Sequence, residues 1–80
     1  MHYVYLLQSV STPTERYTGR TDGLRKRLRQ HNTAKEGHTA KFRPWRVVTY
    51  LGFSEAKKAA AFERYIKQGS GHAFANKHLW

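Results

Sequence analysis

The sequence predicts a small α+β fold whose elements follow the order β-β-α-β-α-α. Segments 2–8 and 45–53 are rich in β-branched and aromatic residues, which is typical of strands. Segments of about 23–34 and 55–68 carry apolar residues at helical spacing. A chain of 80 residues buries one modest core, so we expect a single domain over residues 1–80. Strands and helices in this order suit a layered fold.

The first half of the chain predicts two strands joined by a turn. The segment "HYVYLLQ", residues 2–8, is the first strand, and the polar segment that follows contains Pro13 and indicates a loop. The short segment "RYTG", residues 16–19, can return as an antiparallel partner and ends at Gly19. We therefore expect the first two strands to pair with each other.

A basic helix should follow the second strand. Thr21 or Asp22 can cap a helix that begins near Gly23. Leu24 and Leu28 lie four residues apart and mark its buried stripe. With so narrow an apolar edge, this helix is predicted to leave a wide cationic surface.

The second half predicts a loop, a strand and two helices. Residues 33–44 are expected to form the loop, and the strand 45–53 opens with Trp45, a candidate core residue. Ser54 should cap the helix at 55–68, and Gly69 should close it. The apolar stripe of this helix consists of Ala59, Phe62 and Ile66.

A short last helix is expected after Gly69. Ser70 is the candidate N-cap, and Phe74 is predicted to pack inward. The segment also contains Asn76 and ends at Trp80.

The charge of the chain indicates a polyanionic partner. Fifteen Lys and Arg face five Asp and Glu, which gives a formal net charge of +10. Neutralising phosphates with such cations releases counterions, so nucleic acid is the expected partner and DNA the one we predict. An anionic membrane surface and a merely basic, soluble protein are the alternatives. The cations expected to follow the nucleic-acid backbone are Arg20, Lys26, Arg29, Lys35 and Lys41.

Other features exclude several classes of protein. The sequence has no cysteine, which excludes disulfides and cysteine-ligated zinc. No apolar run approaches the roughly 18 residues that a membrane span needs. The first residues lack the basic region and cleavage site of a signal peptide and indicate a strand instead. We expect a cytoplasmic protein with no membrane partner.

Two residues of the basic helix are candidates for chemistry. Arg27 and His31 are four residues apart and project from the same face. A guanidinium beside an imidazole should lower the pKa of His31 and keep the ring neutral. For the neighbouring cations, a solvated charged face is the simpler interpretation.

Glu63 differs from the other acidic residues because it lies within a helix, directly after Phe62. A carboxylate beside the apolar stripe must be paired or bound to a cation. The simpler alternative is a surface glutamate paired with Lys67, four residues on. A single carboxylate is adequate for Mg²⁺, which keeps several waters and binds substrate phosphate; Mn²⁺ is the alternative cofactor.

Three tyrosines lie on the first two strands. Tyr3 and Tyr5 alternate on one strand and share a face, while Tyr17 lies on the next strand just before Gly19. Half-buried packing would explain them. Two hydroxyls on adjacent strands beside a basic helix would also suit catalysis, and nearby positive charge should lower a phenol pKa from about 10.

Taken together and in this order, these motifs resemble the GIY-YIG nuclease superfamily. They are Tyr-Val-Tyr at 3–5, Tyr-Thr-Gly at 17–19, Arg-x3-His at 27–31 and Glu63. The chain looks like a small stand-alone member akin to the N-terminal nuclease module of UvrC. It departs from the pattern at the first motif and at Thr18, but both tyrosines and Gly19 remain. The resemblance implies a three-stranded antiparallel sheet flanked by helices.

The resemblance also implies metal-dependent endonuclease hydrolysis of DNA phosphodiesters, in DNA repair or processing. It assigns Glu63 as the metal ligand and suggests His38 and Asn76 as further active-site residues. We expect Tyr5, with its proton drawn toward His31, to act as general base, although which tyrosine has that role is open. The catalytic set it implies is Tyr5, Tyr17, Arg27, His31 and Glu63.

Two alternatives of other kinds stay open. The same basic helix could grip phosphate in a nucleic-acid-binding module that does not cleave. Exposed aromatic residues, Trp45 or Trp80, could instead bind RNA. So small a domain has little surface for base-specific readout, so we expect weak sequence preference, with specificity from DNA structure, a protein partner or a homodimer.

Overall fold

Three strands form one antiparallel sheet in the order β2-β1-β3. The computed structural model describes residues 1–80. It confirms the predicted α+β class and order of elements, and it adds one short helix, α2, inside the segment expected to be a loop. The elements are β1 (His2–Ser9), β2 (Arg16–Thr21), α1 (Leu24–Thr33), α2 (His38–Lys41), β3 (Trp45–Phe53), α3 (Ala56–Ile66) and α4 (Gly69–His78).

The central strand β1 is buried on both faces. Four consecutive side chains, from Val4 to Leu7, are at most 1% exposed. A strand with helices over both faces has no polar face, so its sequence is a continuous apolar and aromatic run rather than an alternation. The edge strand β2 alternates instead, with Arg16 and Arg20 exposed, and such charges discourage further strand pairing.

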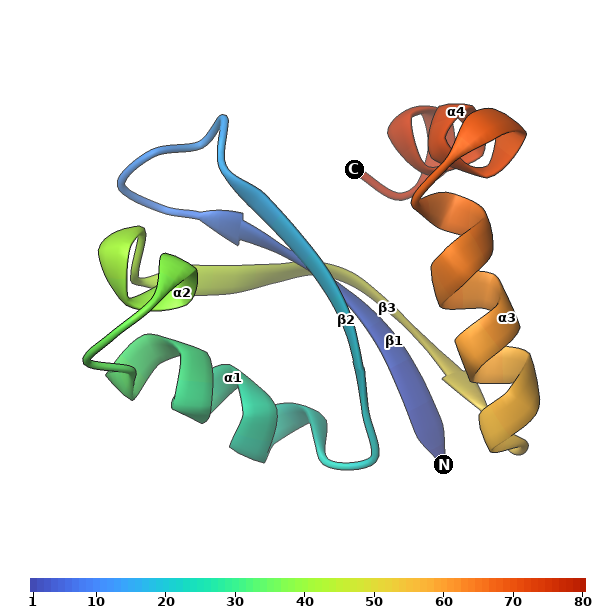
Figure 1. Ribbon diagram of the computed structural model, residues 1–80, viewed down its shortest axis with the longest axis horizontal. Helices are drawn as coiled ribbons and strands as arrows, with labels where there is room; N and C mark the ends of the chain where they lie inside the picture. The colour runs from blue at the N-terminus through green and yellow to red at the C-terminus, as the bar shows by residue number, and fades with distance from the viewer.

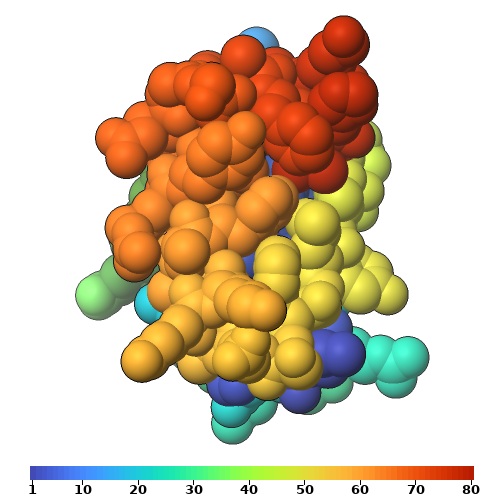
Figure 2. Space-filling model, turned by 90° about the vertical axis from the view of Figure 1, so that its right-hand side faces the viewer, coloured from blue at the N-terminus to red at the C-terminus, as the bar shows by residue number.

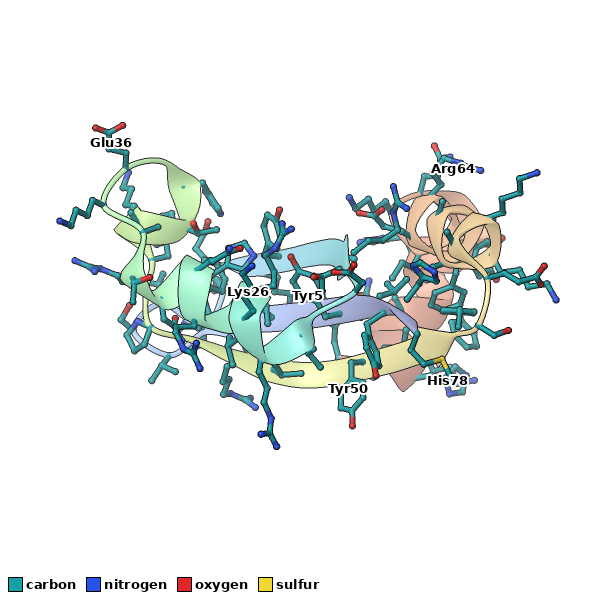
Figure 3. All side chains as sticks on the ribbon, turned by 90° about the horizontal axis from the view of Figure 1, so that it is seen from below. Tyr5, Lys26, Glu36, Tyr50, Arg64 and His78 are labelled. Atoms are coloured by element: carbon teal, nitrogen blue, oxygen red, sulfur yellow. The ribbon has the colours of Figure 1, made fainter.

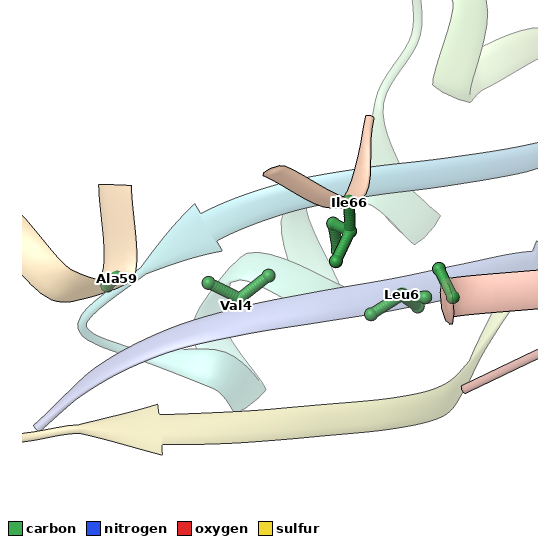
Figure 4. Close-up of a cluster of buried hydrophobic side chains, with 5 residues drawn as sticks. Val4, Leu6, Ala59 and Ile66 are labelled. Atoms are coloured by element: carbon green, nitrogen blue, oxygen red, sulfur yellow. The ribbon is translucent and has the colours of Figure 1, made fainter. Parts of the chain in front are cut away.

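The sheet forms a middle layer between two pairs of helices. Figure 1 shows α1 and α2 on one side of the sheet and α3 and α4 on the other. Val4 and Leu6 of β1 point toward Ala59 and Ile66 of α3 in the first core cluster (Figure 4). Tyr5, Leu7 and Trp45 form the second cluster, toward α1, which confirms Trp45 as a core residue. Burial therefore fixes which face each residue of β1 presents.

The helices α3 and α4 meet through small residues. Together with β3 they make up most of the face shown in Figure 2. A Cβ built on Gly71 would lie 1.7 Å from the carbonyl oxygen of Tyr65, so only glycine permits this approach. Gly71 and Ala75 are the residues of α4 that are buried.

Because Gly71 and Ala75 face the core, the predicted inward packing of Phe74 is wrong. Phe74 is 39% exposed, and its ring lies near those of Tyr65 and His78.

The predicted helix caps are also wrong. The N-cap of α1 is Gly23, and Thr21 instead accepts a hydrogen bond from the Gly23 N–H, at 3.1 Å. Neither Asp22 nor any other side chain caps this helix.

Each of the two later helices begins at a position other than the one predicted. The helix α3 begins at Ala56, so Glu55 occupies the N-cap position in place of Ser54. Gly69, at φ 57°, does not close α3 as predicted, because the C-cap of α3 is Lys67; Gly69 is instead the first residue of α4, which leaves Ser70 inside that helix. No helix of the structure is both long enough and apolar enough to cross a membrane.

Candidate active site

Tyr5 reaches across the neighbouring strand β2 at Gly19. The two residues are directly paired in the antiparallel register. A Cβ on Gly19 would lie 2.6 Å from the hydroxyl oxygen of Tyr5 and 3.0 Å from a ring carbon of Tyr17. The missing side chain of Gly19 is therefore the space that the Tyr5 phenol occupies. The sequence predicts that Gly19 ends the second strand and belongs to a motif, but it carries no sign of this contact.

The Tyr5 phenol is hydrogen-bonded to the imidazole of His31. The hydroxyl oxygen lies 3.0 Å from Nε2, and both residues are buried, at 1% and 8% exposure. In Figure 3, Tyr5 lies in the middle of the molecule between α1 and the pair α3 and α4, with Glu36 far away at one end. The structure thus joins a strand residue to a helix residue 26 positions later.

The position of His31 is fixed by its neighbour Asn32. The Asn32 amide accepts a hydrogen bond from the backbone N–H of Trp45 and donates one to the carbonyl oxygen of the same residue. These bonds anchor the last turn of α1 to the start of β3. Asn32 was not among the residues predicted from the sequence, where its only signal is a polar side chain next to His31 near the end of the helix.

Tyr17 completes an aromatic cluster with Tyr5 and His31. Its ring centroid lies 4.7 Å from that of His31 and 6.2 Å from that of Tyr5. Tyr17 is half-buried, whereas Tyr5 is enclosed. Tyr17 is therefore the more accessible of the two phenols.

The predicted lowering of the phenol pKa is wrong for Tyr5. The pKa of Tyr5 is raised to about 12, mainly by burial and to a smaller extent by the charges of Tyr17 and Glu63, and the lowering effect of Arg27 does not offset this. Removing the phenolate from water outweighs one nearby guanidinium. Tyr5 is accordingly a neutral hydroxyl near pH 7.

The predicted lowering of the His31 pKa is confirmed in direction. Burial is the main cause, and the positive charge of Arg27 adds to it. A neutral imidazole can accept a proton from Tyr5 at Nε2. Arg27 also lines a pocket of about 100 Å³ at the start of α1, beside Lys26.

Glu63 approaches the sheet from α3, on the side opposite α1. Its Oε1 accepts a hydrogen bond from Arg20 Nε and its Oε2 one from Lys67 Nζ, both at 2.8 Å. The side chain is 17% exposed. Burial would raise the pKa of Glu63, but the bonds to Lys67 and Arg20 outweigh it and keep the pKa below its ordinary value. The pairing with Lys67 proposed from the sequence is therefore present.

The charge of Glu63 acts on the tyrosine cluster, which consists of Tyr5, Tyr17 and His31, across the edge strand β2. The Glu63 charge raises the Tyr5 pKa, and Glu63 binds Arg20, the residue that follows Gly19.

Glu63 is a single carboxylate whose bonded neighbours are the cations Arg20 and Lys67. No group of three or more His, Asp or Glu side chains forms a closed metal cage. One half-buried carboxylate fits Mg²⁺, which is bound through one or two carboxylates plus phosphate oxygens and water. Binding there would displace Arg20 or Lys67 from one carboxylate oxygen.

Two groups of predicted residues remain, namely the cations expected to bind nucleic acid and the two further candidates His38 and Asn76. Arg20 lines a pocket of about 260 Å³ with His2, and Lys26, Arg29, Lys35 and Lys41 are exposed. His38 lies 3.8 Å from a Glu15 oxygen, and its ring lies near those of Phe42 and Trp45, so that Trp45 stands between it and Tyr17. Asn76, on α4, accepts a hydrogen bond from Arg16. The structure therefore does not bring His38 or Asn76 to the centre.

The fold and this centre define a small catalytic domain of the α+β class, and comparison with known proteins identifies the family. The GIY-YIG catalytic domain family matches residues 1–77. The chain therefore belongs to the GIY-YIG family, and the resemblance stated from the sequence is confirmed. The closer likeness to UvrC stays a prediction.

Among its relatives are proteins named structure-specific endonuclease subunit SLX1. The one from Candida dubliniensis is 33% identical over 95% of this chain and 28% of its own length. The homolog from Giardia intestinalis is 35% identical over 80% of this chain and 19% of its own length. The chain thus spans about a quarter of the length of the first of these relatives.

A solved structure shares the fold. The UPF0213 protein BH0048 from Bacillus halodurans has 24% sequence identity and a TM-score of 0.56, over 98% of this chain and 85% of that one. At this identity the likeness concerns the fold alone.

Proposed function

We propose that this chain is a divalent-metal-dependent endonuclease that hydrolyses DNA phosphodiester bonds, in DNA repair or processing. The observation that carries the proposal is the buried hydrogen bond between Tyr5 and His31 in a chain of net charge +10. A neutral phenol bonded to a neutral imidazole is equipped to pass on a proton. The surrounding cations would attract a phosphate backbone.

The chain's own residues supply a path for the proton of the attacking water. Tyr5 accepts this proton on its oxygen while it gives its own proton to Nε2 of His31. The hydroxide forms the new bond to phosphorus, and the bond to the departing 3′ oxygen breaks. Because the phenol is never a free anion, a pKa of about 12 for Tyr5 is compatible with this role.

Arg27 and Tyr17 hold the scissile phosphate in this proposal. Arg27 is fixed in charge and lines the pocket at the start of α1, so it can bind phosphate oxygens and stabilise the charge that develops on them. Tyr17 offers the more accessible hydroxyl. A Mg²⁺ or Mn²⁺ ion held by Glu63 would supply Lewis-acid stabilisation of the departing oxygen.

The preferred substrate is branched DNA, and a protein partner contributes to selecting it. This part of the proposal is supported by relatives named as subunits of structure-specific endonucleases. It also agrees with the small surface of an 80-residue chain. A homodimer is the alternative source of additional surface.

A second candidate function is binding of nucleic acid without cleavage. The observation that favours it is that both oxygens of Glu63 are already bonded, to Arg20 and Lys67. In that case the carboxylate is a structural link between β2 and α3 rather than a metal ligand.

A cleavage assay with two glutamate variants separates the two functions. Supercoiled plasmid and a flap or junction substrate are incubated with the protein in Mg²⁺ or in EDTA. We expect Mg²⁺-dependent nicking that Glu63→Ala abolishes. The matched control is Glu55→Ala, which removes an exposed carboxylate that is paired with Lys58 at the start of α3. Binding with no Mg²⁺-dependent nicking would support the binding module, whereas nicking that survives Glu63→Ala would contradict the metal-binding role of Glu63.

A further inference from the structure

A third pocket, separate from the two already described, lies between β2 and the helices α3 and α4. It has a volume of about 290 Å³. Its lining contains two cations and a histidine but no acidic residue. The lining residues are Arg16, Thr18, Ile66, Lys67, His72 and Trp80.

One wall of this pocket is formed by the Arg16 guanidinium, which lies over the Trp80 ring. The Arg16 guanidinium carbon lies 4.6 Å from the Trp80 ring centroid, and an Arg16 nitrogen donates to Asn76 at 3.3 Å. Trp80 itself packs against the first core cluster. Arg16 is thus held over the Trp80 ring, and a guanidinium in such a position can stack with a nucleobase.

The pocket lies next to Glu63, because Lys67 lines the pocket and also bonds Glu63. Arg16, Thr18 and Arg20 alternate along β2 and share one of its faces. Arg20 follows Arg16 by four positions along the strand, which corresponds to about 13 Å.

We propose that this pocket binds one nucleotide of an unpaired DNA strand, a few nucleotides away from the bond that is cut. The inference rests on the proposed nuclease function and adds a site to it. The base stacks on the Arg16 guanidinium that Trp80 supports, and the phosphate binds Lys67 and His72. A phosphate on Lys67 also competes with Glu63 for that ammonium group.

An unpaired strand fits the pocket better than a duplex does. Stacking on a side chain requires a base whose face is free, and bases of a duplex are stacked on each other. No acidic side chain lines the pocket itself, and the carboxylate next to it, that of Glu63, is paired with Arg20 and Lys67. A substrate with a single-stranded branch offers such a nucleotide next to a duplex.

The two tryptophans of the chain allow a direct test of binding by NMR. The measurement is made in EDTA, because it does not require cleavage. The ¹⁵N-labelled protein is titrated with a six-residue oligothymidylate, with a blunt duplex and with inorganic phosphate. We expect the Trp80 indole signal to shift saturably with oligothymidylate, and to shift less with the other two. Trp45 is the internal control, because its indole N–H is bonded to the Thr39 carbonyl oxygen inside the core.

A charge-matched pair of variants tests the same site by affinity. Arg16→Gln should weaken oligothymidylate binding by about fivefold or more, because it removes the stacking surface. Lys57→Gln removes the same charge from an exposed residue of α3 and should change binding less than about twofold.

Several results would overturn the inference. They are an unchanged Trp80 signal at oligonucleotide saturation, an equal response to the blunt duplex or to phosphate, or equal effects of the two variants. Because these measurements need no catalysis, their failure would leave the cleavage assay with Glu63→Ala unaffected, and a failure of cleavage would leave them readable.

Discussion

The hydroxyl oxygen of Tyr5 and Nε2 of His31 lie 3.0 Å apart in the interior, although they come from the first strand and the end of the first helix. Two local features make this contact possible. Gly19 leaves room for the phenol on β2, and Asn32 anchors the turn of α1 that carries His31. The contact ties the folding of the sheet to the chemistry of the centre, and each feature can be altered separately.

Changing Gly19 to Ala should disrupt the centre. The new Cβ would meet the Tyr5 hydroxyl at 2.6 Å and the Tyr17 ring at 3.0 Å. Overpacking of this kind costs about 1–3 kcal/mol of stability. We expect a loss of that size in chemical denaturation, together with a shifted His31 ring signal in NMR.

Gly23→Ala is the matched control for Gly19→Ala. Its Cβ would approach no atom closer than the Lys26 Cβ at 3.8 Å, which is an ordinary contact. If both alanine variants unfold at the same denaturant concentration, the phenol does not depend on the space at Gly19.

The lowered pKa of His31 should make the protein less stable at mildly acidic pH. In the unfolded chain the imidazole titrates near its ordinary pKa of 6.5, whereas burial and Arg27 lower that pKa in the folded protein. Below pH 6.5 the unfolded state therefore binds more protons. The free energy of unfolding should fall as the pH drops from about 6.5 to 5.

His31→Gln should flatten this dependence in the same pH range. His78→Gln, at an exposed position of α4, serves as the control and should keep the slope of the unaltered protein. Parallel slopes for His31→Gln and the unaltered protein would show that the buried imidazole is not the group responsible.

Releasing one oxygen of Glu63 should improve metal binding at this carboxylate. Arg20→Gln removes the cation on Oε1, so a divalent ion no longer has to displace it. We expect Mn²⁺, followed by EPR, to bind up to about fivefold more tightly, the range of an exposed ion pair.

Lys58→Gln is the control for Arg20→Gln, since it frees the exposed Glu55 and changes the net charge equally. Equal effects of the two substitutions on Mn²⁺ affinity would mean that the ion responds to overall charge and not to Glu63.

The sequence predicts the elements of this fold well because their signals are long and periodic. The strand 45–53 matches β3 from end to end, and Leu24 and Leu28 of α1 pack on the second core cluster as expected. The prediction of an N-cap requires the start of the helix to be placed to within one residue. That is why Ser54 and Ser70, one or two positions away from the actual N-caps, were assigned wrongly.

The candidate centre is less predictable than the fold, because burial decides its electrostatics. Spacing places Arg27 and His31 on one face, but it cannot show that the Tyr5 phenol is enclosed, and enclosure reverses the expected direction of its pKa. Likewise, Arg16, Lys67, His72 and Trp80 share no motif, and only the packing of α4 beside β2 brings them together.

The most direct test of the central claim is a double-mutant cycle on the Tyr5–His31 pair, measured as the single-turnover rate of Mg²⁺-dependent cleavage of a branched DNA. If the phenol passes its proton to the imidazole, Tyr5→Phe and His31→Gln should each slow cleavage by about 10²-fold or more, and the double variant should be no slower than the slower single one. Rate losses that multiply in the double variant, or single variants that cleave at the rate of the unaltered protein, would contradict the account.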